Sequence, residues 1–159
     1  MTRNIGLACN LMIDKLIFKK FKSTDKQLYK QSIDLRNAVL RGPLKRLMTP
    51  KEMIIEQNNQ FYGITIADTL VTTFSSYQKD KNTVRTAYQR HGFGTHLLCW
   101  AIADFRKQGY QRVSLSARAS AHDFYLKQGF KDTGKPKLNS YLNVMDFEMQ
   151  YIITPKLHQ

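Results

Sequence analysis

Short runs of aromatic and β-branched residues, separated by polar segments, predict strands in the first half of the chain. An antiparallel meander is expected after residue 60, because only short polar turns separate the runs there. We place these turns at Asp68-Thr69 and at Tyr77–Asn82. The runs that predict strands are Leu16–Phe21, Phe61–Ala67, Leu70–Ser75 and Thr83-Val84.

Two helices are predicted between the first strand and the meander. The segment Leu28–Val39 carries apolar and small residues at helical spacing, and Gly42-Pro43 would end it. Thr24 and Gln27 fit a capping box at its start. The segment Thr49–Glu52 combines a cap residue, a proline at the first helical position and a glutamate at the third, so a short second helix is expected.

A longer helical pattern follows the meander and ends at Gly109. Alternating apolar and polar residues over Arg112–Ala117 then predict a strand. Ser120 is expected to cap another helix that Gly129 ends, and Val144–Ile153 reads as a final strand. The order predicts an α/β fold of the α+β type. The apolar face of the long helix consists of Leu97, Leu98, Ala101, Ile102 and Phe105.

Composition fits one folded domain with a strong positive charge. The chain has 159 residues, of which 42% are hydrophobic, and this excludes disordered and collagen-like classes. Lys and Arg number 25 against 12 Asp and Glu, which gives a formal net charge of +13. Such a charge attracts anions at long range. Nucleic acid, an anionic membrane surface and a phosphate-rich cofactor all fit, and the charge alone does not choose among them.

Cysteine usage and hydropathy exclude further classes. Two cysteines and four scattered histidines argue against a disulfide framework and against a zinc site, so no metal is expected. No apolar run approaches the roughly 20 residues of a membrane span. The weakly apolar stretch Ile5–Ile13 has no clear cleavage site after it and does not read as a signal peptide. We therefore expect a cytoplasmic protein with no membrane partner, and we expect Cys99 to pack in the core rather than act as a nucleophile.

The segment Val84–Leu98 carries the clearest chemical signal. It runs from a predicted strand into the start of the long helix, and it contains Gly92 and Gly94. Glycines let the backbone approach a ligand closely, and the unpaired amides of a helix start bind phosphate. A Rossmann fingerprint would need a third glycine where Leu97 stands, and the G-K-[ST] of a P-loop is absent.

These residues resemble the GNAT N-acetyltransferase superfamily. Val84 followed by Gln89-Arg90-x-Gly92-x-Gly94 is similar to its acetyl-CoA motif, and Ala121-x-x-Phe124-Tyr125-x-x-x-Gly129-Phe130 is similar to its second signature. Leu35–Leu44 is similar to a first-helix signature of small bacterial members. The resemblance covers nearly the whole chain. We expect an N-terminal extension over residues 1–14, a GNAT domain over 15–154 and a C-terminal tail over 155–159.

The resemblance implies a mixed, mostly antiparallel sheet flanked by helices. Its fourth and fifth strands would end near Val84 and Ala117 and splay apart, with pantetheine between them. Tyr125 would be the general acid for the departing CoA thiolate, and the Val84 backbone amide would bind the thioester oxygen. A homodimer is common in the family. The resemblance places acetyl-CoA against Val84, Gln89, Arg90, His91, Gly92, Phe93, Gly94 and Thr95.

The implied reaction is direct acetyl transfer from acetyl-CoA to a primary amine of a small molecule or protein. The general base stays open: Glu56 is a candidate, although an exposed helix-end glutamate is the simpler reading, and Asp146 stands where small bacterial members often carry histidine. His91 and His122 read as surface residues. Two alternatives remain, a basic nucleic-acid- or ribosome-binding module and a GNAT scaffold that binds acetyl-CoA without transferring it. Nucleic acid is the less expected partner, because no nucleic-acid-binding signature is present.

Overall fold

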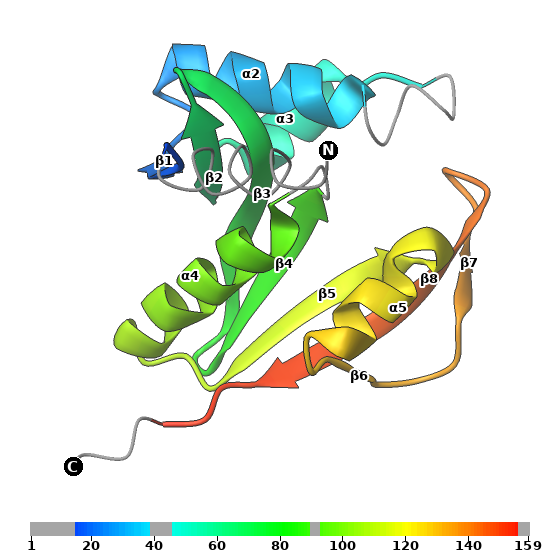
Figure 1. Cartoon of the computed structure of the whole chain (residues 1–159). Helices are drawn as coiled ribbons and strands as arrows, with labels where there is room; N and C mark the ends of the chain where they lie inside the picture. Colours follow the sequence, from blue (N-terminus) through cyan, green and yellow to red (C-terminus); the bar gives the residue numbers. More distant parts are fainter. Residues whose placement is uncertain (1–14, 39–45, 90–92, 156–159) are drawn as a thin grey trace, which may run out of the picture.

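The computed structural model describes residues 15–38, 46–89 and 93–155. One sheet with helices on both faces makes up this part of the chain (Figure 1). Its strands are β1 (Ile17–Phe21), β2 (Gln60–Ile66), β3 (Thr69–Asp80), β4 (Thr83–Gln89), β5 (Arg112–Arg118), β6 (Lys131–Asp132), β7 (Lys137–Asn139) and β8 (Val144–Ile152). Its helices are α2 (Lys26–Arg36), α3 (Pro50–Glu56), α4 (Gly94–Lys107) and α5 (Ala119–Lys127).

The sheet is mixed and mostly antiparallel, as predicted. Its strands follow the order β1-β2-β3-β4-β5-β8-β6, and β7 pairs with β8. Within the described strands, β4 and β5 form the single parallel pair. A parallel connection needs a crossover, and α4 supplies it. The pairing therefore changes from antiparallel to parallel at β4 and β5 and returns to antiparallel at β8.

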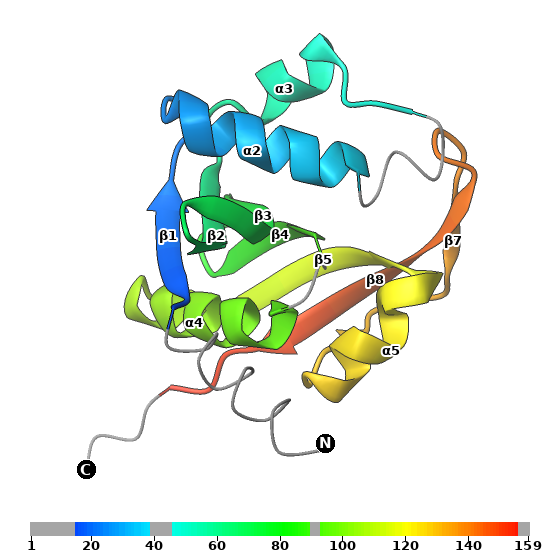
Figure 2. The same ribbon diagram turned by 45° about the horizontal axis from the view of Figure 1, so that its top comes forward.

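The helices form two layers on opposite faces of the sheet (Figure 2). Helices α2 and α3 lie over the β1–β3 half, where Phe21, Phe61 and Leu70 form a small buried cluster. Helices α4 and α5 cover the opposite face and enclose the main core. This arrangement leaves the α2 and α3 side of β4, β5 and β8 without a helical cover (Figure 2). The apolar face predicted for the long helix is confirmed, because all five of its residues are buried.

The helix starts confirm one predicted cap and correct two. Thr49 and Glu52 form the predicted capping box at the start of α3. Helix α2 is capped by Asp25 rather than Thr24: its side chain accepts a hydrogen bond from the amide of Leu28 at 3.2 Å. Helix α5 begins directly after β5, so its cap position is Arg118 and not Ser120, and no side-chain cap bond forms. Gly42-Pro43, the predicted stop of α2, lies outside the described residues.

The meander has longer strands and tighter turns than predicted. The first turn is at Ala67-Asp68, with φ of 48° and 65°, rather than at Asp68-Thr69. Strand β3 continues to Asp80, and the second turn is only Lys81-Asn82. Residues 77–80 are polar and exposed, which is why their sequence resembles a turn, but they pair with β4. Strand β4 extends well beyond Thr83-Val84, to Gln89, and its later residues pair with Thr73–Ser76.

The C-terminal region adds two short strands that the pattern does not predict. Strands β6 and β7 are two and three residues long, too short for periodicity to be visible. Gly129 adopts a φ of +95° at the end of α5, as expected of a helix-terminating glycine. The predicted final strand is confirmed as β8, which pairs with β5, β6 and β7.

Candidate functional site

Strands β4 and β5 pair only over their first halves and then separate. Their Cα partners run from Thr83 opposite Arg112 to Thr86 opposite Leu115. Beyond that rung β4 continues along β3 and β5 continues along β8, so the two strands form a V (Figure 1). The backbone groups on the inner edges of the V have no strand partner across it. They can therefore bind an extended ligand that enters between the strands.

The structure corrects the expectation that β4 ends near Val84. Val84 is the second residue of β4, lies opposite Val113 and is buried in the main core. The strand ends at Gln89 instead. The backbone groups at the point of divergence therefore belong to Ala87 and the residues after it. The expected oxyanion-binding role of a strand-end amide stays a prediction.

Helix α4 is the element that follows β4 in the chain, and its first turn has the features of an anion-binding helix start. Its cap residue Phe93 has a left-handed backbone (φ 46°, ψ 12°) and makes no side-chain cap bond. The Leu97 amide donates to the Phe93 carbonyl at 3.1 Å, so the amides of Gly94, Thr95 and His96 precede the helical hydrogen-bond ladder. No acidic residue lies in the first turn of α4. The first-turn amides and the positive end of the helix dipole together favour a phosphate group here.

The predicted cofactor residues fall partly within this region. Gly94 is buried as the first residue of α4, and exposed Thr95 accepts a hydrogen bond from the Gln128 side chain at 3.4 Å. This contact joins the end of α5 to the start of α4. The predicted cofactor residues Arg90, His91 and Gly92 lie outside the described residues, as does the side chain of Gln89.

Tyr125 lies on α5 and is buried in the main core at 3% exposure. Its ring packs edge-on against Phe124 and Phe130, with centroid distances of 5.2 and 5.4 Å. Helix α5 packs against β5 and β8, so Tyr125 is held on the α4 and α5 side of the V. Its proposed role as a proton donor stays a prediction.

An ion pair crosses β5 on the opposite face of the sheet. Arg85 on β4 donates two hydrogen bonds to Glu148 on β8, each at 2.9 Å. These bonds hold the pKa of the Glu148 carboxyl below its usual range. Sequence reasoning did not find this pair, because 63 residues separate the partners. The pair keeps the Glu148 carboxylate ionised, and Arg85 already binds both of its oxygens.

Asp146 lies two residues before Glu148 and therefore faces the same side of β8. It is half-buried and accepts a hydrogen bond from the Asn139 side chain at 2.9 Å. Its Cα partner on β5 is Arg118, the last residue of the diverging strand. Asp146 thus places an oriented carboxylate one strand away from the open end of the V.

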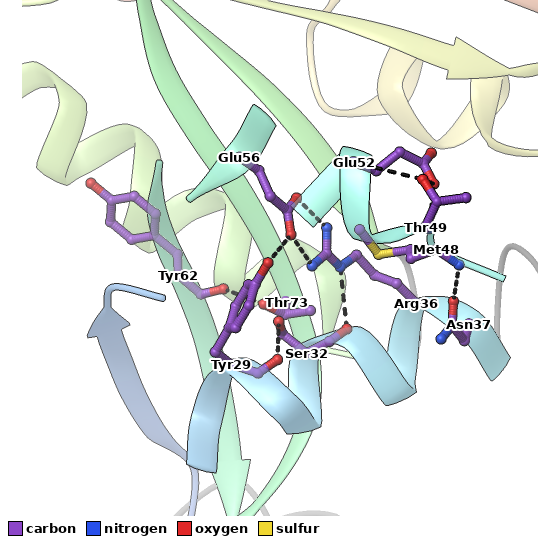
Figure 3. Close-up of polar contacts among 10 residues, drawn as sticks. All are labelled: Tyr29, Ser32, Arg36, Asn37, Met48, Thr49, Glu52, Glu56, Tyr62 and Thr73. Carbon is purple, nitrogen blue, oxygen red and sulfur yellow. Dashed lines mark hydrogen bonds and ion pairs between the residues drawn. The ribbon is translucent and has the colours of Figure 1, made fainter. Parts of the chain in front are cut away.

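Glu56 is buried and not exposed, which corrects the simpler reading of its role. Its carboxylate accepts two hydrogen bonds from Arg36, both at 2.7 Å, and a third from the Tyr29 hydroxyl at 2.8 Å (Figure 3). The side chains of Arg36 and Glu56 are only 7% and 11% exposed. Burial, together with the bond to Glu56, raises the pKa of Tyr29 to about 12. This pair fastens α2 to the end of α3 and leaves Glu56 little capacity to accept a substrate proton.

Two further expectations about single residues are wrong. Cys99 is exposed. The buried face of α4 includes Leu98 and Ile102, and Cys99 lies on the other side of the helix. His122 is not a plain surface residue: its ring stacks on Phe147 at 4.1 Å, and Nε2 lies 2.8 Å from an Asp132 carboxylate oxygen. This contact links α5 to β6 and β8.

Within the described ranges, no group of three or more His, Cys, Asp and Glu side chains is arranged to hold a metal ion. None of the helices in that part of the chain has the length and apolar character to cross a membrane.

Comparisons with known proteins agree with this geometry. The family model described as "Acetyltransferase (GNAT) domain" matches residues 38–151. A comparison with curated proteins gives no match. Among solved structures, Ard1 from Thermoplasma volcanium has a TM-score of 0.68 at 18% identity, covering 88% of this chain and 99% of its own.

Two other similar structures have a stated chemistry of their own. The ribosomal-protein-S18-alanine N-acetyltransferase from Escherichia coli has a TM-score of 0.68 at 16% identity, and 91% of this chain and 99% of that one are covered. An aminoglycoside 6'-N-acetyltransferase complexed with coenzyme A has a TM-score of 0.69 at 15% identity, with coverage of 89% and 99%. At such identities the structures establish a shared fold. Because the family model matches residues 38–151, from just after α2 into β8, it spans most of the chain, and the protein belongs to the GNAT acetyltransferase family.

Proposed function

We propose that the protein transfers an acetyl group from acetyl-CoA to a primary amine of a small molecule or protein. Membership of the GNAT family supports acetyl-CoA as the acetyl donor. Two features carry the proposal: the V between β4 and β5, and the start of α4, the next element after β4, which has no side-chain cap bond.

The two features would hold different parts of the donor. The phosphates would lie against the amides from Gly94 to His96, and Gln89 and Arg90 would flank them as the family resemblance implies. The pantetheine arm would extend into the V, which brings the thioester to the last rung at Thr86. A strand-end amide after Thr86 would then donate to the oxyanion that forms on the thioester oxygen.

In this reaction the amine nitrogen attacks the thioester carbonyl carbon directly. A C–N bond forms, the C–S bond breaks and the amine loses a proton, while the CoA sulfur leaves as a thiolate. Tyr125 would donate a hydrogen bond to that sulfur. A thiol pKa near 8.5 and a phenol pKa near 10 differ by roughly 2 kcal/mol against full proton transfer. Tyr125 therefore stabilises the thiolate mainly as a donor, and solvent completes the protonation.

We propose that Asp146 binds the amino group of the acceptor. Of the carboxylates considered, Glu56 is bound by Arg36, and Glu148 is bound by Arg85. Asp146 accepts a hydrogen bond from the neutral amide of Asn139, lies beside the open end of β5, and stands opposite Arg118 on β5 and Lys137 on β7. A carboxylate in that place can hold an ammonium group and receive its proton.

A thermal-shift panel tests the donor assignment. A ligand that binds only the folded state raises the melting temperature, so acetyl-CoA should do so, whereas duplex DNA and RNA should not. Stabilisation by nucleic acid without any response to acetyl-CoA would replace the proposal with the binding-module alternative. Stabilisation by acetyl-CoA with no turnover on any amine would leave a non-catalytic scaffold.

A further inference from the structure

Three side-chain hydroxyls in the described part of the chain are buried without a hydrogen-bond partner. They belong to Thr65, Thr86 and Ser114, which are 1%, 5% and 7% exposed. Leaving a buried hydroxyl unpaired costs about 1–3 kcal/mol, and most buried polar groups in native proteins avoid this cost. A purely structural position of this kind would be filled better by valine or alanine.

Two of the three hydroxyls lie on adjacent rungs at the vertex of the V. Thr86 is opposite Leu115 on the last rung that joins β4 to β5, and Ser114 is opposite Arg85 on the rung before it. Directly after Thr86, Ala87 is exposed. Thr65 is different, since it lies on β2 opposite Ile17 and Leu70, where the sheet does not open.

The two vertex hydroxyls face opposite sides of the sheet. Side chains alternate along a strand, so Thr86 shares the side of Val84, which is buried beneath the α4 and α5 layer. The start of α4 belongs to the same layer. Ser114 shares the side of Arg85 and lies beside the ion pair with Glu148. Thr86 is therefore the hydroxyl on the side from which a ligand held at the start of α4 would enter the V.

We propose that Thr86 is a positioning residue for the pantetheine arm of acetyl-CoA, an inference that rests on the proposed function. The arm carries amide groups and a thioester carbonyl, and a hydroxyl can both donate and accept hydrogen bonds. The apolar surroundings of Thr86, among them Leu115, strengthen such a bond relative to one made in water. The bond would fix the position of the thioester along the V, relative to the last rung at Thr86 and Leu115.

The test compares Thr86→Val with Thr65→Val. Valine keeps the shape of threonine and removes only the hydroxyl, so both variants should unfold at a denaturant concentration equal to or above that of the wild type. Thr86→Val should bind acetyl-CoA about 2- to 12-fold more weakly, the range expected for one lost hydrogen bond. Its affinity for the nucleotide half of CoA, which lacks the arm, should be unchanged. Thr65→Val should bind both ligands as the wild type does.

The outcomes separate this inference from the proposed function. Equal acetyl-CoA affinity in wild type and Thr86→Val would overturn the role of Thr86 and leave the proposed function intact. A Thr86→Val variant that loses stability but keeps full affinity would overturn it too, since the hydroxyl would then serve only the folded protein. A wild type that does not bind acetyl-CoA would overturn both. If Thr86→Val does not fold, Thr86→Ser should bind more tightly than Thr86→Ala, and equal affinities would contradict the inference.

Discussion

Arg36 and Glu56 form a buried, doubly hydrogen-bonded ion pair between α2 and α3, with both N–O distances at 2.7 Å. The pair joins α2 to α3, and the Glu56 carboxylate also accepts a hydrogen bond from the Tyr29 hydroxyl (Figure 3). A carboxylate so engaged holds the two helices in place, and it identifies Glu56 as a structural residue.

Replacing Glu56 by glutamine should destabilise the fold. The change leaves the buried Arg36 charge without its counter-ion, and breaking a buried pair on one side costs about 3–5 kcal/mol. The matched control is Asp34→Asn, which breaks the exposed Lys30–Asp34 pair and should cost less than about 1 kcal/mol. Urea denaturation measures both. An equally stable Glu56→Gln protein that has lost turnover would instead make Glu56 catalytic.

The raised pKa of Tyr29 predicts a loss of stability at alkaline pH. The folded-state pKa is about 12 against an ordinary value of 10.0, so folding favours the neutral phenol. This contribution is complete below pH 10 and is lost as pH rises toward 12. Denaturation midpoints should therefore fall less steeply between these pH values in Tyr29→Phe than in the wild type. Parallel curves for the two proteins would show that Tyr29 ionisation does not contribute.

Replacing Gly94 by valine should abolish tight acetyl-CoA binding. Gly94 is buried at the first position of α4, where a β-branched side chain would stand among the amides proposed to hold phosphate. Gly134→Val is the control, because nothing lies within 4 Å of a side chain added there. Calorimetry on the two folded variants decides the matter: unchanged affinity in Gly94→Val would contradict the phosphate site.

Tyr125→Phe should slow turnover and leave acetyl-CoA affinity nearly unchanged. The ring and its packing against Phe124 and Phe130 are kept, and only the hydroxyl is removed. The expected fall in kcat is about 10- to 1000-fold. This range begins below the usual contribution of acid–base groups, because Tyr125 would act mainly as a hydrogen-bond donor. Full activity of this variant would remove Tyr125 from the mechanism.

The acceptor should carry an anionic group as well as the amine. The net charge of +13 repels a polycation at long range. Near the V, Glu148 is held by Arg85, and Asp146 stands opposite Arg118 and Lys137, so Asp146 would hold at most a single ammonium group. An amine with a carboxylate or phosphate should therefore exceed spermidine in kcat/KM, by a margin that shrinks at high salt. Asp146→Asn should raise KM for the amine and leave acetyl-CoA affinity unchanged.

Spermidine preferred over every anionic amine would show that local contacts, and not the net charge, set the specificity. An Asp146→Asn enzyme with unchanged KM for the amine would remove Asp146 from the acceptor site. Glu148→Gln is the comparison variant for that measurement, because its carboxylate is already held by Arg85.

Local signals made much of the fold predictable. The helical spacing of apolar residues such as Leu97 and Phe105 predicted the long helix, and the Thr49 capping box predicted the short one. The turn before β4 was placed too early because exposed polar residues up to Asp80 form strand rather than turn. Alternation of Val84 and Thr86 with Arg85 was a signal for the longer strand that could have been used.

The polar contacts of the site could not be predicted in the same way. Arg85 and Glu148 meet across an intervening strand, and Arg36 on α2 meets Glu56 on α3. Pairings between residues so far apart in sequence depend on strand order and helix placement, and no local pattern encodes these. The unpaired hydroxyl of Thr86 is likewise visible only once the divergence of β4 and β5 is known.

The most direct measurement of the central claim is turnover of acetyl-CoA with a panel of primary amines, following free thiol and acetylated amine together. We predict release of CoA thiol that depends on the amine and is matched by one acetylated product per thiol, identified by mass spectrometry. Thiol release that is independent of any amine, or no acetylated product from any amine in the panel, would contradict the account.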